Sequence, residues 1–298
     1  MKRLHKFLPM KRTVSIITIL IAAAGFTACE DVIDLEVPEG KTFTVVDAWI
    51  TNAPGRQDIR ITQTAPYTST QPAPIVDDAV VTLTDLTDGI TYDFTFANGL
   101  YSYDPGAGNS IGQLNHAYRL RITLGTEVFE AIDTIRNVPV IDSITYEYKS
   151  KEDAASNEEG YYASFHGRDL PGQTDYYWIR SYRNTLDKRE ADVFAIDGAF
   201  NENMADSSAF IVPISEGITE FDKPYQLNET VIVRIASCTK ASHTFLTHVE
   251  SQLENGGLFA TILQNVKSNL VNTNAASEAR VLGWFGASSV NYKEKVIR

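Results

Sequence analysis

Short runs of alternating apolar and polar residues recur through most of the chain. In residues 91–96 three aromatic side chains alternate with threonine and aspartate, and residues 118–124 and 144–149 repeat the pattern. Because successive side chains of a strand point to opposite faces, a period of two places one face in a core and the other in water. Turn-forming segments separate these runs, and no helical periodicity intervenes before Ile135. The pattern predicts a mainly β protein built from antiparallel, Ig-like β-sandwiches.

The chain divides into two predicted sandwich domains, over residues 41–138 and 139–298. Pro139 favours a boundary, because proline cannot continue a central strand. In the first domain Asp88-Gly89 predicts a tight hairpin turn. The predicted strands of the C-terminal domain cover residues 141–148, 161–165, 176–183, 209–214, 230–237 and 281–285.

One short helix is predicted in the C-terminal domain, over Ser242–Asn255. Its apolar residues fall on one stripe, Ser242 is placed to cap its start, and Gly256-Gly257 is placed to end it. Residues 258–280 are predicted to form a polar loop, and residues 293–298 a charged end.

The first 28 residues have the pattern of a secretory signal peptide. Five basic residues precede an apolar run over 14–24, which is shorter than the roughly 20 residues that a membrane-spanning helix needs. The run ends in residues 25–29, where small residues precede Cys29 and resemble the lipobox of bacterial lipoproteins. The resemblance implies a diacylglycerol on the Cys29 thiol and cleavage just before it. The alternative is an ordinary signal peptide cleaved near Ala28.

Acidic residues follow Cys29 directly and form a predicted tether over residues 29–40. Glu30, Asp31 and Asp34 resemble the export signal of surface lipoproteins in Bacteroidota. The alternative is a solvated acidic linker without a signalling role. With Cys29 acylated only Cys238 remains, so no intrachain disulfide is expected, and Cys238 is predicted to be a buried residue of a strand.

The net charge excludes two classes of partner. The chain has 26 basic and 38 acidic residues, for a formal charge of −12, and removal of residues 1–28 with their five basic groups makes it −17. Such a surface does not attract nucleic acid, and it does not bind an anionic membrane unaided. We therefore expect the membrane to be reached through the lipid anchor.

Metal sites and catalytic groups are not predicted. Oxygen-bearing side chains gather in residues 192–206, where the alternatives are a Ca²⁺ site and a solvated loop. The members of this loop are Asp192, Asp197, Asn201, Asn203 and Asp206. His243 and His248 are five residues apart, which turns them to different sides of a helix and disfavours a zinc pair. No Gly-x-Ser-x-Gly elbow is present, and we expect neither an enzyme nor a cofactor.

Clustered aromatic residues leave two interpretations open. The cluster comprises Tyr161, Tyr162, Tyr176, Tyr177, Trp178 and Tyr182. Aromatic faces at a sheet edge can stack on a glycan or pack against a protein or peptide. For Tyr176 and Trp178, the alternation favours side chains that fill the second core.

Several segments in order resemble one family. They are Cys29 with its acidic tether, residues 44–52 (TVVDAWITN), residues 139–144 (PVIDSI), Phe245, residues 256–259 (GGLF) and residues 281–288 (VLGWFGAS). Together they resemble the domain-of-unknown-function family 4249 (DUF4249) of Bacteroidota outer-membrane lipoproteins. The resemblance implies a role beside a TonB-dependent outer-membrane receptor and supplies no catalytic residues.

The sequence thus predicts a lipid-anchored outer-membrane protein that faces the cell exterior. We expect a non-catalytic binding or accessory component of a TonB-dependent nutrient-uptake system, with a glycan or peptide as a possible ligand. The alternative is an adhesin or a structural surface protein.

Overall fold

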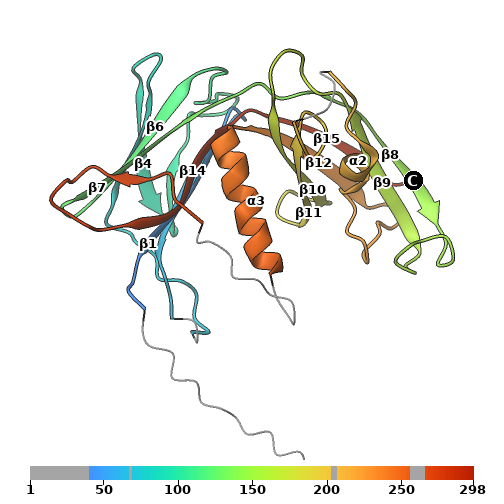
Figure 1. The fold of residues 1–298 in the computed structure, drawn as a ribbon, viewed down its shortest axis with the longest axis horizontal. Coiled ribbons are helices and arrows are strands. Elements are labelled where there is room, and N and C mark those ends of the chain that lie inside the picture. The colour runs from blue at the N-terminus through green and yellow to red at the C-terminus, as the bar shows by residue number, and fades with distance from the viewer. Residues whose placement is uncertain (1–39, 67–68, 203–206, 256–265) are drawn as a thin grey trace, which may run out of the picture. The chain divides into compact units, whose positions relative to one another are not determined.

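Nine strands form one continuous sheet that curls until its two ends lie side by side (Figure 1). The structure is a computed structural model that describes residues 40–66, 69–202, 207–255 and 266–298. Within it, Lys41–Arg298 form one compact unit. In spatial order the strands of this sheet are β13 (Val271–Asn272), β7 (Glu127–Thr134), β6 (Ala117–Leu124), β3 (Val80–Asp85), β4 (Thr91–Ala97), β5 (Leu100–Tyr103), β2 (Gln57–Gln63), β1 (Thr44–Thr51) and β14 (Val281–Ser288).

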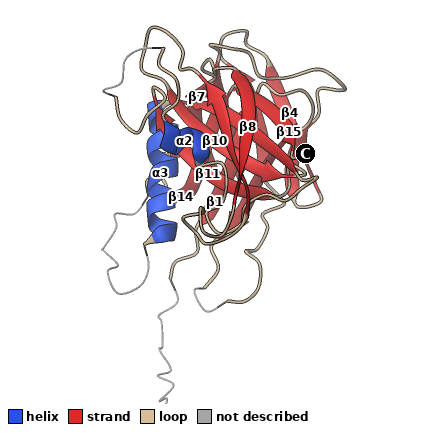
Figure 2. Cartoon of the chain, turned by 90° about the vertical axis from the view of Figure 1, so that its right-hand side faces the viewer, coloured by secondary structure: helices blue, strands red, loops and turns tan. Residues whose placement is uncertain are grey.

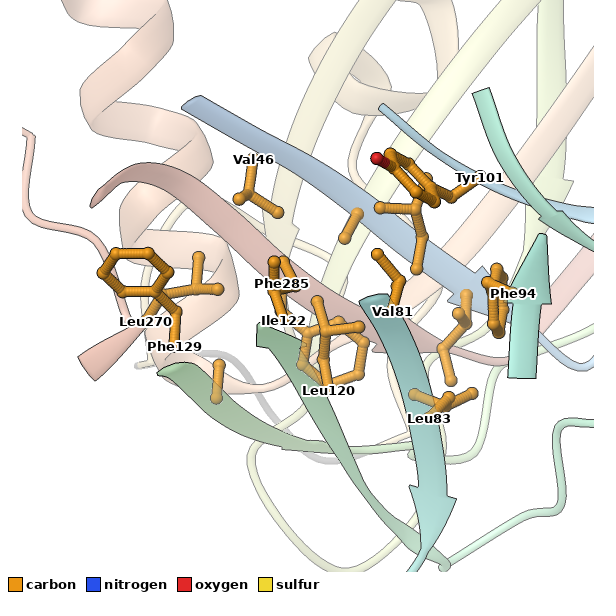
Figure 3. Close-up of a cluster of buried hydrophobic side chains, with 14 of the residues drawn as sticks. Val46, Val81, Leu83, Phe94, Tyr101, Leu120, Ile122, Phe129, Leu270 and Phe285 are labelled. Atoms are coloured by element: carbon orange, nitrogen blue, oxygen red, sulfur yellow. The ribbon is translucent and has the colours of Figure 1, made fainter. Parts of the chain in front are cut away.

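The inward side chains of this sheet make the first hydrophobic core. In β1 the buried residues Val46, Ala48 and Ile50 alternate with accessible ones, as a period of two requires. Phe285 of β14 and Leu270 join side chains from the first half of the chain in the same cluster (Figure 3). The first core is therefore completed by residues that lie near the end of the sequence.

Side chains, instead of a backbone ladder, join the two ends of the sheet. The Asn269 amide donates to the Phe285 carbonyl (2.7 Å) and accepts from the Phe285 N–H (3.0 Å). The Asp133 carboxylate accepts from the Ala287 N–H (3.1 Å). The result is a nearly closed barrel, so the predicted sandwich is wrong for this part of the chain. Alternation identifies the buried face of a sheet. It does not show whether that face packs against a second sheet or whether the sheet closes into a barrel around it.

Two smaller sheets form the second part of the structure and share the second hydrophobic core. The four-stranded sheet is ordered β11 (Arg189–Ile196), β10 (Tyr176–Arg183), β12 (Thr230–Cys238) and β15 (Val290–Val296). The two-stranded sheet pairs β8 (Ile141–Lys149) with β9 (Gly160–Gly167). Buried residues of both sheets, including Phe165, Tyr177 and Val233, pack into one cluster with residues around helix α2 (Val212–Glu216). The prediction of a mainly β protein is confirmed.

A buried crossing joins the two parts where β14 passes into β15. Ser289 lies between these strands, and its N–H donates to Oγ of Ser237 in β12 (3.0 Å). Both hydroxyls donate to the carbonyl of Arg136, which precedes β8. Ser237, Ser289 and the Arg136 carbonyl are thus paired where the three segments meet, whereas the neighbouring Ser288 hydroxyl is buried without a hydrogen-bond partner among the described residues.

Helix α3 (Lys240–Glu254) lies between the barrel and the four-stranded sheet (Figure 1), and Figure 2 shows it along one side of the strands. The helix begins two residues before the predicted start. Thr239 is its cap and accepts from the Ser242 N–H (3.3 Å), so the prediction of Ser242 as the cap is wrong. Among the described residues, the helices lack the length and apolarity needed to cross a membrane.

Most predicted strands are confirmed, and two errors have clear causes. The 80–86 and 90–96 hairpin is present as β3 and β4, with Gly89 at φ +73° in its turn. The predicted strand at 209–214 is wrong, because Pro213 opens α2 there. Strands β11 and β15 were not predicted, since polar side chains obscure their alternation.

Candidate functional site: an aromatic groove beside helix α3

A groove of about 950 Å³ runs between helix α3, the outer face of the barrel and the four-stranded sheet. We call it the α3 groove. Its walls come from strands β1, β2 and β14 on one side, β10 and β11 on the other, and residues 245–254 of α3. Its volume lies at the upper end of the range typical of ligand sites. A smaller hollow of about 500 Å³ lies on β8 and β9 beside Thr219.

All three tryptophans of the chain line the α3 groove. Trp49 projects outward from β1, because its neighbours Ala48 and Ile50 point into the barrel. Its ring lies 5.2 Å from that of Trp178 on β10, centroid to centroid. Trp284 of β14 stacks on Phe245 of α3 at 4.6 Å. These contacts hold large aromatic faces along both walls.

A buried hydrogen-bond chain fixes the start of α3 against the barrel. The Trp284 indole Nε1–H donates to Oγ of Ser242 (2.9 Å), and the Ser242 hydroxyl donates to Oδ2 of Asp133 (2.7 Å). Burial raises the pKa of Asp133, while the Ser242, Thr134 and Ala287 donors oppose that rise by stabilising the carboxylate. The chain orients the indole that forms one wall of the groove.

Charged groups on β10 and β11 flank the aromatic wall. The Trp178 indole Nε1–H donates to Oδ1 of Asp192 (2.7 Å), and Nε of Arg189 lies 3.2 Å from Oδ2 of the same carboxylate. The Arg180 guanidinium lies over the Trp178 ring, 3.8 Å from its centroid. Its Nε is buried and has no hydrogen-bond partner among the described residues.

Two carboxylates on the other walls are partly desolvated. Asp47 of β1 is accessible within the groove, yet the surrounding protein raises its pKa, and Arg60 on β2 opposes that rise. Burial also raises the pKa of Glu250 on α3, helped by the nearby charges of Glu254 and Asp192. Leu253, one helical turn further along, is 82 % exposed at the edge of the groove.

The predicted lipidation and export residues cannot be placed. Cys29, Glu30, Asp31 and Asp34 lie outside the described residues, and the predictions made for them stand as predictions. Cys238 is described, and the prediction that it is buried is confirmed. Burial raises the pKa of its thiol, which disfavours a reactive thiolate.

Asp192 and Asp197, two described residues of the 192–206 segment for which a Ca²⁺ site and a solvated loop are the alternatives, take part in separate contacts. Asp192 lies in β11, where it holds Trp178 and Arg189, whereas Oδ1 of Asp197 accepts from the Asp175 N–H (2.6 Å). Asn203 and Asp206 lie outside the described residues. Burial and the neighbouring Asp169 raise the pKa of Asp175 to about 6.

The histidines of α3 do not form a metal pair. His243 is buried, and desolvation lowers its pKa to about 4, whereas His248 is exposed. Among the described residues, one other group offers three possible ligand atoms: Asp85, Asp88 and His116. Asp85 accepts from two N–H groups of the β3–β4 turn and lies 2.7 Å from His116 Nδ1. These contacts stabilise the turn and account for the proximity of the three side chains.

The aromatic cluster on β10 is divided between two environments. Tyr177 is fully buried in the second core, and its hydroxyl donates to Asp169 (2.6 Å). Trp178 points to the opposite face and packs beneath α3, where it also lines the groove. The hydroxyl of Tyr176 donates to Glu202 (2.6 Å). The prediction that Tyr176 and Trp178 fill the second core is therefore wrong, since both lie on the α3 side of the sheet.

Sequence reasoning did not predict Trp49, Trp284 or Arg180 as site residues. A signal was present, because Trp49 lies between two residues that point into the barrel, and an outward tryptophan needs a partner or a ligand. Arg180 gave no such signal, since an arginine in an alternating strand is ordinary.

Segments on which the family resemblance rests meet at the groove: residues 44–52, Phe245 and residues 281–288. No protein with a curated description matches this chain. The family described as "Domain of unknown function (DUF4249)" matches residues 30–294, which is most of the sequence, and the chain therefore belongs to the DUF4249 family.

Proposed function

We propose that this protein is a lipid-anchored, surface-exposed binding protein of the outer membrane that serves a TonB-dependent nutrient-uptake system without catalysing a reaction. The α3 groove is its ligand site. The observation that carries the proposal is the gathering of all three tryptophans of the chain in one groove. Aromatic walls with a few charged groups are typical of binding sites.

The anchor is supported by the sequence. Cys29 follows a signal-peptide pattern and precedes Glu30, Asp31 and Asp34, so acyl chains would hold the protein at the membrane while its acidic surface faces away. Labelling of cells with an alkyne fatty acid tests this step. Label is expected on the wild type and not on Cys29→Ser, whereas label that persists in Cys29→Ser would contradict lipidation at this residue.

The partner is tested by affinity purification of the tagged chain from detergent-solubilised outer membrane. We expect a TonB-dependent receptor to co-purify with the wild type and to be lost with Cys29→Ser, which is not retained at the membrane. Recovery of fimbrial or matrix components without a receptor would contradict the transport role and would favour the alternative of an adhesin or structural surface protein.

A further inference from the structure

Arg180 is the one feature of the α3 groove that the packing of the protein leaves unexplained. Its Nε is buried without a hydrogen-bond partner among the described residues, and its guanidinium lies over the Trp178 ring in the groove wall. A buried donor without a hydrogen-bond partner is costly, and stacking on an indole offsets only part of that cost. The protein therefore retains a cation here at the expense of its own stability.

A second arginine makes the local charge less favourable. Arg234 of β12 lies directly opposite Arg180 in the β10–β12 ladder, and like charges in that relation destabilise a sheet. Among the described residues, no carboxylate lies within ion-pair distance of either guanidinium. Asp192, the neighbour of Arg180 on β11, is held by Trp178 and Arg189 instead.

The other cations of the groove differ from Arg180 in this respect. Arg189 has its ion pair with Asp192, and Arg60, which lies near Asp47 without an ion pair among the described residues, is exposed to water. Arg180 is thus the groove cation that keeps a buried donor without a hydrogen-bond partner among the described residues, and a guanidinium fork is suited to bidentate binding of an oxyanion.

We propose that the α3 groove binds a small amphipathic anion, with its oxyanion on Arg180 and its apolar, ring-containing body against Trp49, Trp178 and Trp284. The proposal rests on the proposed binding function and adds the chemical class of the ligand. The aromatic wall supplies apolar surface chiefly through Trp49, since Trp178 and Trp284 are only 9 % and 8 % exposed, and Arg180 supplies the orientation that such surface lacks.

Two fluorescent probes that share an aromatic body test the proposal. 8-Anilinonaphthalene-1-sulfonate carries a sulfonate, and N-phenyl-1-naphthylamine is its uncharged counterpart. Titrated into the full chain, the sulfonate is expected to bind more tightly than the uncharged probe. Arg180→Gln is expected to weaken sulfonate binding about tenfold or more and to leave the uncharged probe nearly unchanged. Arg180→Lys is expected to restore part of the affinity, because it keeps the charge without the fork.

Arg121→Gln is the matched control, since Arg121 is an accessible arginine on the barrel that is paired with Glu130. It is expected to leave the binding of both probes unchanged. Thermal unfolding separates recognition from structure: Arg180→Gln removes a charge that has a buried unpaired Nε and faces Arg234, so its melting temperature is expected to equal or exceed that of the wild type. A lower melting temperature with unchanged sulfonate affinity would assign Arg180 to structure and overturn the proposal.

The remaining outcomes distinguish this inference from the proposed function. Equal binding of both probes, insensitive to Arg180→Gln, would overturn the anionic ligand and leave an apolar binding groove. Binding of neither probe would overturn the groove as a ligand site altogether. A preference for the sulfonate that Arg180→Gln abolishes would support the inference.

Discussion

The indole of Trp49 lies across the backbone of Gly286, its register partner in the parallel β1–β14 pair. A Cβ at position 286 would lie 2.1 Å from Cζ3 of Trp49. Glycine at this position therefore lets the ring lie flat on the barrel, where it reaches Trp178 of the opposite sheet. One wall of the groove thus depends on the absence of a single methyl group.

Gly286→Ala is expected to displace Trp49 and to lower the free energy of unfolding by about 2 kcal/mol, as overpacking of a tight site does. Urea unfolding measures the loss. Gly40→Ala is the control, because a Cβ there meets nothing within 4 Å. In the double variant Trp49→Ala/Gly286→Ala the clash is absent, so the two changes should cost less together than the sum of their separate costs. If the cost of the double variant equals the sum of the two single costs, the proposed contact between the Trp49 ring and position 286 is contradicted.

Ser242→Ala is expected to lower the free energy of unfolding by about 2 kcal/mol. It removes a donor from the buried Asp133 carboxylate and the acceptor of the Trp284 indole. Ser251→Ala is the matched control on the same helix, since Ser251 is exposed and bonds only a carbonyl of its own helix. An equal effect of the two substitutions would show that Ser242 does not hold α3 to the barrel.

His243 is expected to make the protein sensitive to acid. Burial between Tyr176 and Phe194 lowers its pKa to about 4, whereas an unfolded histidine titrates near 6.5. Its stabilising contribution is present above pH 6.5 and is lost as the pH falls towards 4, because the unfolded chain binds the proton more tightly.

Between pH 7 and pH 5 this change amounts to about 1 to 2 kcal/mol for a partly screened group. His243→Phe should remove it, and His248→Phe, at an exposed position, should not. The difference in unfolding free energy between wild type and variant, measured in urea at both pH values, is the test. A difference that does not change with pH would mean that His243 has the same pKa in the folded and the unfolded chain, which would contradict the effect of burial.

His116 is expected to titrate in the opposite direction. Its hydrogen bond to Asp85 raises its pKa above the ordinary value near 6.5. The pair stabilises the β3–β4 turn fully below pH 6.5 and loses that effect as the pH rises through the folded pKa. Proton NMR of the imidazole in buffer with EDTA measures the shift. Asp85→Asn, which can still accept from the turn, should bring the pKa back towards 6.5, and an unchanged value would contradict the assignment.

The sequence predicted strands better than it predicted how they assemble. Alternation located β4, β6 and β8, and in β6 the alternating residues Tyr118, Leu120 and Ile122 are the buried ones. It could not show that Phe285 and Leu270 return to the first core, since such long-range pairings leave no local pattern. Pro213 was the local clue to α2 that the strand prediction over 209–214 overlooked.

The groove was less predictable than the fold. Its walls combine β1, β10, α3 and β14, which are brought together only by the tertiary structure. The outward position of Trp49 follows from its place between two inward residues of a strand. The unpaired state of Arg180, in contrast, depends on the tertiary structure, in which Asp192 contacts Trp178 and Arg189 instead. Family resemblance pointed to three of the converging segments without showing that they meet.

The three indole N–H signals of the protein report directly on whether the α3 groove is the ligand site, because every tryptophan of the chain lines the groove. Two-dimensional ¹H–¹⁵N NMR during titration with 8-anilinonaphthalene-1-sulfonate should move the signals of Trp49, Trp178 and Trp284 with the affinity seen by fluorescence. Fluorescence enhancement with all three indole signals unmoved would place the bound probe elsewhere and contradict the assignment of the α3 groove as the ligand site.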